Sequence, residues 1–264
     1  MPGGGWGRGG QGGMVEVILY VFSGLLGLVV GSFLNVVIYR LPRGESLVRP
    51  GSHCPKCGAD IRWFDNVPLV SWALLHGKCR ACGTEISKRY PFVEALTAAA
   101  FLLSAWRFAF SWELLVSWLF VAALIVVAFI DFDHMIIPNK IVLPGAVVGL
   151  AASIAMHPHR WWVYLAGSLG GATFLLLLAL VWPGGMGPGD VKMALFMGAF
   201  LGAEVLVALF LAFLSGAVVG LYLILVKKRS RKSRVPFGPF LAFGSVVALY
   251  VGELILRSYL SLYA

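Results

Sequence analysis

The sequence predicts an all-α polytopic membrane protein, a bundle of about eight transmembrane helices that carries one small polar loop module. Hydrophobic residues make up 59% of the 264 residues and charged residues only 12%, against about 25% charged residues in ordinary soluble domains. The mean hydropathy is +0.87, and the apolar residues gather in segments long enough to cross a bilayer. A soluble enzyme, a disordered chain and a DNA-binding domain are therefore excluded as descriptions of the whole chain.

The apolar segments divide the chain into four parts. Residues 1–14 are rich in glycine and predict a flexible tail, and residues 15–38 predict the first transmembrane helix. A loop at residues 39–90 precedes the remaining bundle, residues 91–262. The eight predicted spans are residues 15–38, 91–108, 113–131, 138–156, 161–182, 190–202, 204–226 and 236–261. They are expected to be helices, because a spanning helix satisfies its own backbone hydrogen bonds. The segment of about 13 residues at 190–202 is too short to cross the hydrocarbon core unaided.

Positive charge predicts the orientation of these spans. All but four of the 21 Lys and Arg residues lie in or beside four loops. These loops are residues 39–90, 132–137, 183–189 and 227–235. Because cytoplasmic loops collect Lys and Arg, we place these loops in the cytoplasm and the N-terminal tail outside. The basic run at 227–234 is interpreted as a signal for topology and lipid headgroups, so the net charge of +9 does not predict nucleic-acid binding.

All four cysteines lie in the loop at residues 39–90, as the pairs Cys54–Cys57 and Cys79–Cys82. Two C-x-x-C turns can close a tetrahedral shell of four thiolates around Zn²⁺, although the spacing between these pairs is slightly longer than usual. A closed shell predicts a structural zinc site, because a catalytic zinc keeps an open position. The alternatives are two disulfides, which a reducing cytosol disfavours, and a thioredoxin-type redox pair.

Carboxylates at membrane depth are costly and by default mark a functional site. Asp131 ends the span at 113–131, and Asp190 opens the segment at 190–202. In the predicted topology both lie at cytoplasmic helix ends and can meet at one depth. Two adjacent carboxyl groups share one proton, so one can activate water while the other polarises a carbonyl group. The pair therefore predicts the chemistry of an aspartic peptidase.

Structural interpretations of these residues remain open. Asp190 could be the N-cap of its helix, and Asp131 or Asp133 could be an interfacial carboxylate that balances Lys140. Asp133 is expected to be a structural or surface residue, because two helical positions turn it about 200° away from Asp131.

Motifs elsewhere in the chain extend this pattern. In chain order they are GSFLNVVIYRLP at 31–42, SHCPKC at 52–57, DNVPLVSW at 65–72, the second cysteine pair, RYPFVE at 89–94, IDFDHMIIP at 130–138 and GPGDVK at 187–192. Together they resemble the type IV prepilin leader peptidases, a family of G-x-G-D intramembrane aspartic peptidases, from about residue 24 to the C-terminus. The chain departs from the family at Asn139, because many members have Asp after the Ile-Pro. Gly187 and Gly189 would let an extended peptide approach closely and would permit backbone conformations that other residues cannot reach.

The resemblance implies a bifunctional, multi-pass enzyme of the bacterial inner membrane whose active site faces the cytoplasm. Such an enzyme cleaves the basic leader of type IV prepilins or type II secretion pseudopilins, after the glycine that precedes the mature N-terminus. It then N-methylates the new terminal residue with S-adenosylmethionine. By this resemblance Asp131 and Asp190 are the catalytic pair, and the zinc ligands are Cys54, Cys57, Cys79 and Cys82.

The cofactor site is harder to predict, because no G-x-G-x-x-G turn follows a strand. We expect S-adenosylmethionine to bind near the cysteine module, with Gly77, Lys78 and Glu94 as candidate residues, although Lys78 equally fits one more topology charge. For a substrate helix, close packing against small residues suggests the fifth predicted span, although glycine-rich helices more often pack against their own bundle. The small residues there are Gly167, Gly170 and Gly171.

Other functions compete with this interpretation. The chain could be a peptidase without methyltransferase activity, whose loop clamps the substrate. It could be a transporter or proton pathway that uses Asp131 and Asp190 as relay groups, but such folds have inverted repeats and helices broken near the midplane, and neither is visible. It could also be a zinc-dependent assembly factor without catalysis. The sequence does not predict an oligomeric state.

Overall fold

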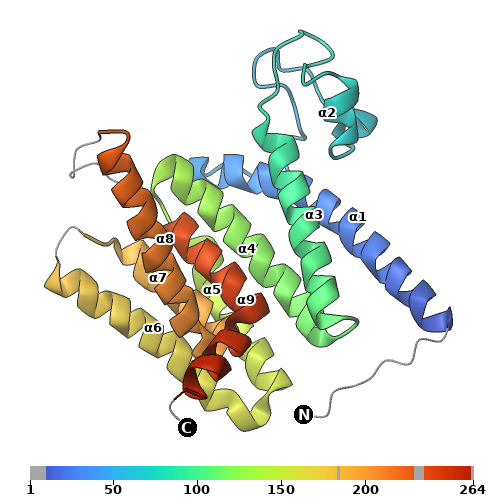
Figure 1. Cartoon of the computed structure of the whole chain (residues 1–264). Helices are drawn as coiled ribbons and strands as arrows, with labels where there is room; N and C mark the ends of the chain where they lie inside the picture. Colours follow the sequence, from blue (N-terminus) through green and yellow to red (C-terminus); the bar gives the residue numbers. More distant parts are fainter. Residues whose placement is uncertain (1–9, 183–184, 229–234, 263–264) are drawn as a thin grey trace. The chain divides into compact units, whose positions relative to one another are not determined.

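The computed structural model describes residues 10–182, 185–228 and 235–262, and most of these residues are helical (Figure 1). Within this described part, eight long helices match the eight predicted segments. They are α1 (Gly10–Arg40), α3 (Arg89–Phe108), α4 (Trp112–His134), α5 (Asn139–Met156), α6 (Trp161–Val181), α7 (Pro188–Leu201), α8 (Val205–Leu225) and α9 (Gly238–Leu260). The loop between α1 and α3 contains the short helix α2 (Val70–Leu74) and, in the described residues, two isolated β-bridges in place of strands. The predicted all-α class is confirmed.

Six segments of the described chain are long and apolar enough to cross a membrane, which identifies a multi-pass membrane protein. Helix α3 is not among them, because Glu94 and Arg107 lower its hydropathy. Helix α7 has 14 residues and rises about 21 Å, less than the ~30 Å hydrocarbon core. It continues through a 3-10 turn, Gly202–Glu204, into α8, and α7 and α8 together form one of the six candidate spans.

The predicted N-terminal tail and the basic run at 227–234 lie partly outside the residues that the structure describes. Of the predicted glycine-rich tail, residues 1–9 lie outside the described residues, whereas residues 10–14 already belong to α1. The helix therefore begins earlier than the apolar run that predicted it. Residues 229–234 of the basic run also lie outside the described residues.

The chain forms two compact units. The first unit contains most of α1, the cysteine loop, α3 and the beginning of α4. In it, α1 and α3 pack almost backbone to backbone. A Cβ atom added to Gly27 would lie 2.6 Å from the Ala98 Cα atom, and one added to Gly31 would lie 2.7 Å from the Glu94 Cα atom. Small residues thus allow this close helix pair, and the Asn35 side chain joins it by donating to the Tyr90 carbonyl oxygen at 3.1 Å.

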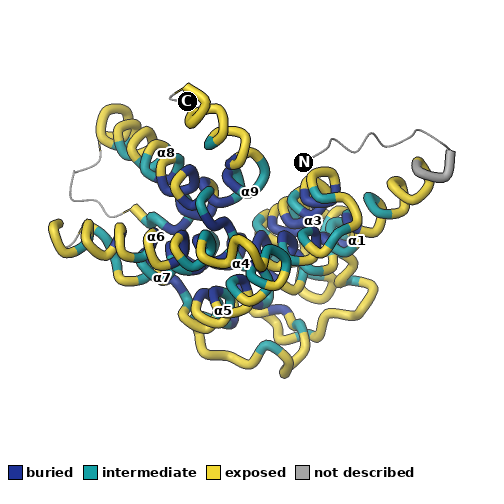
Figure 2. Tube along the Cα trace, turned by 90° about the horizontal axis from the view of Figure 1, so that it is seen from below, coloured by how far each residue is buried: buried dark blue, intermediate teal, exposed yellow. Residues whose placement is uncertain are grey.

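The second unit contains residues 37–47 and 119–264, including the rest of α4 and helices α5 to α9. Helix α7 packs against α5 and α6, and α8 packs against α9. Figure 2 shows buried residues concentrated in α7 and on the inner sides of α8 and α9, while the outer turns of α6 and α8 are exposed. An aromatic cluster of Phe120, Phe196 and Phe200 fills this core, with ring centroids 4.5–5.3 Å apart.

The glycines of α6 pack mainly within their own bundle. A Cβ atom added to Gly167 would clash with the carbonyl oxygen of Gly202, and one added to Gly171 would meet Val205 at 3.4 Å. Only Gly170, of the three glycines that suggested a docking surface, has open space beside it. Gly167 and Gly171 therefore pack against the protein's own helices, as the alternative interpretation predicted.

Candidate active site and metal centre

Asp131 lies in the last turn of α4 and is 5% exposed. The helix ends shortly after it because Met135 adopts a left-handed conformation, with φ of 54°. The Met135 N–H donates to the Asp131 carbonyl oxygen at 2.8 Å, and Pro138 is the N-cap of α5. The short connection leaves Asp131 buried at a helix end, as the sequence predicts, while Asp133 is exposed.

The Asp131 carboxylate is held by a residue far along the chain. The N–H of Gly238, the first residue of α9, donates to its Oδ2 atom at 2.8 Å. Sequence reasoning missed this residue. The signal that could have found it is the sequence PFGPF at 236–240, a Gly-Pro pair at the start of an apolar span.

Asp190 lies in the first turn of α7 and is 8% exposed. It is not the N-cap, which is Gly187; Asp190 occupies the third helical position. Its carboxylate reaches back, and Oδ2 accepts the Gly187 N–H at 3.0 Å. This contact is the side-chain half of a capping box, so Asp190 satisfies one of the unpaired N–H groups at the helix start.

Asp131 and Asp190 both lie in the second compact unit. The beginning of α7 approaches the connection that follows Asp131, because a Cβ atom added to Gly189 would lie 3.1 Å from the Ile137 Cβ atom. Each carboxylate accepts one N–H at Oδ2; among the described residues no hydrogen bond is made to Oδ1 of either. Two buried carboxyl groups that lie adjacent can share one proton, and the Oδ1 atom of each aspartate remains for chemistry.

The two glycines before Asp190 do not have the unusual backbone conformations that the sequence suggested. Gly187 has φ of −87° and ψ of 154°, which is ordinary extended backbone, and Gly189 is not among the described residues with positive φ. Neither therefore needs a conformation closed to other residues. Gly189 instead makes a tight contact, because a Cβ atom there would lie 3.1 Å from the Ile137 Cβ atom.

Asn139 and Lys192 link the beginnings of α5 and α7. The Lys192 Nζ atom donates to Asn139 Oδ1 at 3.0 Å. The Asn139 amide oxygen therefore accepts a hydrogen bond from Lys192.

The cysteine pairs lie on two turns of the same construction. The Cys54 carbonyl oxygen accepts the Gly58 N–H, and the Cys79 carbonyl oxygen accepts the Gly83 N–H, both at 2.9 Å. Gly58 and Gly83 have φ of 72° and 69°, a left-handed conformation that favours glycine. The sequence thus builds two equivalent turns, each of which presents two thiols.

The four Sγ atoms lie within 4.8 Å of one another. The Sγ atoms of Cys54 and Cys82 are 3.9 Å apart, close to the ~3.8 Å edge of a tetrahedron with Zn–S distances of about 2.3 Å. All four cysteines are free thiols rather than disulfides. Hydrogen bonding with Thr84 lowers the pKa of the Cys82 thiol to about 6, whereas hydrogen bonding with Cys82 raises the pKa of the Cys57 thiol to about 11. The residues therefore fit a four-thiolate metal site.

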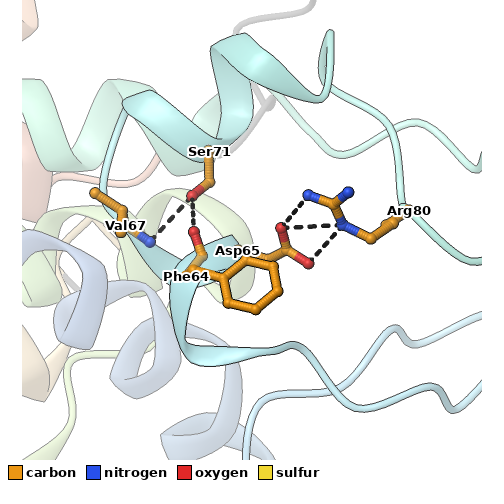
Figure 3. Close-up of polar contacts among 5 residues, drawn as sticks. All are labelled: Phe64, Asp65, Val67, Ser71 and Arg80. Atoms are coloured by element: carbon orange, nitrogen blue, oxygen red, sulfur yellow. Dashed lines mark hydrogen bonds and ion pairs between the residues drawn. The ribbon is translucent and has the colours of Figure 1, made fainter.

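An ion pair ties the second cysteine turn to the loop around α2 (Figure 3). The Arg80 guanidinium donates to both carboxylate oxygens of Asp65, at 2.6 and 2.9 Å, and lowers the pKa of that carboxyl group. In the same loop the Ser71 hydroxyl donates to the Phe64 carbonyl oxygen at 2.8 Å and accepts the Val67 N–H at 3.1 Å. The DNVPLVSW segment is thus ordered by contacts that the sequence does not reveal.

The three candidate cofactor residues have separate structural roles. Gly77 has φ of 67°, and a Cβ atom there would lie 2.9 Å from the Trp72 ring. Lys78 pairs its backbone with Glu85. The buried Glu94 carboxylate accepts the Leu69 N–H at 2.8 Å. Within the described residues no hydrogen bond or ion pair joins Glu94 to Gly77 or Lys78, and the three stay candidate cofactor residues.

Comparison with known proteins adds an independent finding. A model of the bacterial peptidase A24 N-terminal domain matches residues 25–108, and a model of the type IV leader peptidase family matches residues 118–221. The junction between the two models falls close to residue 118, where the two structural units divide. No solved structure shows significant similarity to the chain.

Several curated relatives named prepilin leader peptidase/N-methyltransferase are similar to nearly the whole chain. The protein from Pseudomonas aeruginosa is 37% identical over 269 residues, which cover 89% of this chain and 91% of the relative. The protein from Aeromonas salmonicida is 36% identical, covering 92% and 93%. The protein from Bacillus subtilis is 34% identical, covering 93% and 98%.

Proposed function

Because the chain belongs to the type IV leader peptidase family, we propose that it is a bifunctional membrane enzyme that cleaves and then N-methylates prepilins or pseudopilins. Asp131 and Asp190 are the catalytic pair. The observation that carries this assignment is that two carboxylates, distant in sequence, are both buried at helix ends, each held through Oδ2 by a glycine N–H. The names of the relatives support both activities.

Cleavage follows from the shared proton of the pair. The ionised carboxyl group takes a proton from water, and the protonated one donates a hydrogen bond to the carbonyl oxygen of the scissile glycine. The hydroxide adds to the carbonyl carbon, and the carbon–nitrogen bond then breaks as the leaving amine takes a proton from the pair. The products are a leader with a new carboxylate and a mature chain with a new amino group.

The location follows from the charge pattern and the substrate class. A prepilin presents a basic leader in the cytoplasm and a long apolar helix in the bilayer. A site at the cytoplasmic ends of α4 and α7 meets the junction of these two parts. We therefore assign the protein to the bacterial inner membrane, with the active site facing the cytoplasm, as the Lys and Arg distribution predicts.

The four cysteines would hold a structural zinc ion. Their Sγ atoms fit a closed tetrahedral shell, which leaves no open position for catalysis. The zinc would give the small loop a core that its few apolar residues do not supply.

The second activity needs a methyl donor, and S-adenosylmethionine supplies an electrophilic methyl group for the new amine. We derive no chemical step from the candidate cofactor residues Gly77, Lys78 and Glu94. Their contacts support a different contribution: Gly77 packs beside Trp72, and Glu94 holds Leu69. These residues shape the loop that we assign to methylation.

Mass spectrometry of a cognate prepilin tests this function. The purified full-length protein in detergent is incubated with the substrate, with and without S-adenosylmethionine. We expect loss of the leader in both samples and a gain of one methyl mass on the new terminus only with the methyl donor. Leader loss without methylation would leave a peptidase alone, and an uncut but tightly bound substrate would overturn the catalytic assignment.

A further inference from the structure

The beginning of α9 contributes to the site in a way that the catalytic pair alone does not explain. Gly238 is the first residue of this 23-residue helix, and its N–H is directed at Asp131 Oδ2. Asp131 lies near the C-terminal end of its own helix, in the last turn of α4. The carboxylate therefore faces the helix end where unpaired N–H groups favour an acceptor.

The contact leaves no room for a side chain at Gly238. A Cβ atom there would lie 2.7 Å from Asp131 Oδ2 and 3.0 Å from both its Cβ and Cγ atoms. Gly238 does not have positive φ, so its backbone conformation does not demand glycine. The demand comes from the carboxylate itself, which occupies the space that any side chain would need.

The position of this N–H is fixed by aromatic packing. Phe237, the N-cap of α9, has its ring 5.2 Å from that of Phe213 on α8 and 6.2 Å from that of Phe240. The Phe237 carbonyl oxygen accepts the N–H groups of Phe240 and Leu241 at 3.0 and 3.1 Å. Leu241 is fully buried. The helix start is therefore held against α8 by side chains on both sides of Gly238.

We propose that Gly238 is a positioning residue for cleavage, which fixes Asp131 through Oδ2 so that Oδ1 is presented to the reacting groups. This inference rests on the proposed peptidase function. Asp190 obtains the same support from Gly187, three residues away in its own turn. Among the described residues, no N–H group near Asp131 in the sequence donates to its carboxylate. The N–H group at the beginning of α9 donates instead.

The test compares Gly238→Ala with Gly220→Ala. Gly220 lies in α8, and a Cβ atom there meets nothing within 4 Å, so this variant controls for replacing a helical glycine. We expect Gly238→Ala to lower kcat for prepilin cleavage about 100-fold, as a small misplacement of a catalytic group does, with little change in KM. Gly220→Ala should cleave like the unchanged protein. An unchanged kcat, or a loss that appears only in KM, would overturn the proposal.

A second variant covers the case in which Gly238→Ala does not fold. Phe237→Ala adds no atom near Asp131 but loosens the helix start, and it should lower kcat about tenfold with an unchanged KM. Full activity of Phe237→Ala would contradict the proposal. Asp131→Asn is measured alongside: if it still cleaves, the peptidase assignment fails, whereas if it is inactive and both α9 variants are fully active, only this inference fails.

Discussion

The Gly238 N–H donates to Asp131 Oδ2 at 2.8 Å across 107 positions of the sequence. Asp190 receives the equivalent contact from Gly187, only three positions away. One carboxylate is thus held by its own helix turn, and the other by a helix from the far end of the chain. The last helix therefore contributes a contact to the proposed catalytic site, beside the two helices that carry the aspartates.

The two glycines of the G-x-G-D turn should respond differently to substitution. In Gly189→Ala the new Cβ atom meets Ile137 at 3.1 Å, whereas in Gly187→Ala it meets Asp190 Oδ2 at an ordinary 3.5 Å. We expect Gly189→Ala to slow cleavage about tenfold, because a displacement of α7 misplaces Asp190. Gly187→Ala should be close to unchanged. Steady-state cleavage rates check this order, and equal losses would contradict it.

Loss of the metal should separate the two activities. Cys82→Ser, or chelation of the purified protein, removes a ligand or the ion from the four-thiolate site. We expect zinc content to fall, methylation of a pre-cleaved substrate to be lost, and leader cleavage to persist, because Asp131 and Asp190 lie in the other compact unit. Ser87→Ala, in the same loop, is a control that retains all four ligands. Equal loss of both activities would contradict a purely loop-based role for the metal.

The Asp65–Arg80 pair should make the stability of the cysteine loop depend on pH. Arg80 lowers the pKa of Asp65 in the folded protein, so the pair stabilises the fold above the unfolded pKa of about 3.9. This contribution is lost as the pH falls through the lowered folded pKa. Asp65→Asn should therefore destabilise the loop at pH 7, and its difference from the unchanged protein should shrink at low pH.

Thermal unfolding between pH 7 and pH 3 measures that difference. Asp60→Asn is the matched control, because Asp60 lies in the same loop, is exposed and makes no side-chain ion pair among the described residues. A difference for Asp65→Asn that persists or grows at low pH would contradict the assignment to the ion pair.

An acidic residue at position 139 should strengthen the link between α5 and α7. Asn139→Asp would place a carboxylate on Lys192, whose Nζ atom lies 3.0 Å from the present amide oxygen. We expect a gain in stability of up to about 1 kcal/mol, typical of a surface ion pair, and unchanged cleavage. Asn139→Leu removes the acceptor and should reduce stability. Thermal unfolding in detergent measures both, and a stabilising Asn139→Leu would refute the link.

Features that depend on local patterns could be predicted from the sequence. The eight helices follow from apolar runs, the cluster of four cysteines follows from two C-x-x-C turns, and the places of Asp131 and Asp190 at helix ends follow from the limits of the apolar runs. The early beginning of α1 at Gly10 was not predicted, because glycine-rich sequence favours a tail and carries no helix signal.

Features that depend on long-range packing could not be predicted. Gly238 reaches Asp131 only because α9 packs against α7 and α8. The tight contact at Gly189 depends on Ile137 from another segment. The contacts of Gly77 with Trp72 and of Glu94 with Leu69 likewise follow from the fold of the loop, which no short-range sequence pattern fixes.

The central claim is that Asp131 and Asp190 form one catalytic pair, and single-turnover cleavage of a prepilin tests it most directly. Asp131→Asn and Asp190→Asn should each lower the rate at least about 10³-fold, within the range for lost acid–base catalysis, and the double variant should lose little more. Asp133→Asn, which alters an exposed neighbour, should cleave normally. Substantial cleavage by either single variant, or a multiplicative loss in the double variant, would contradict a shared catalytic pair.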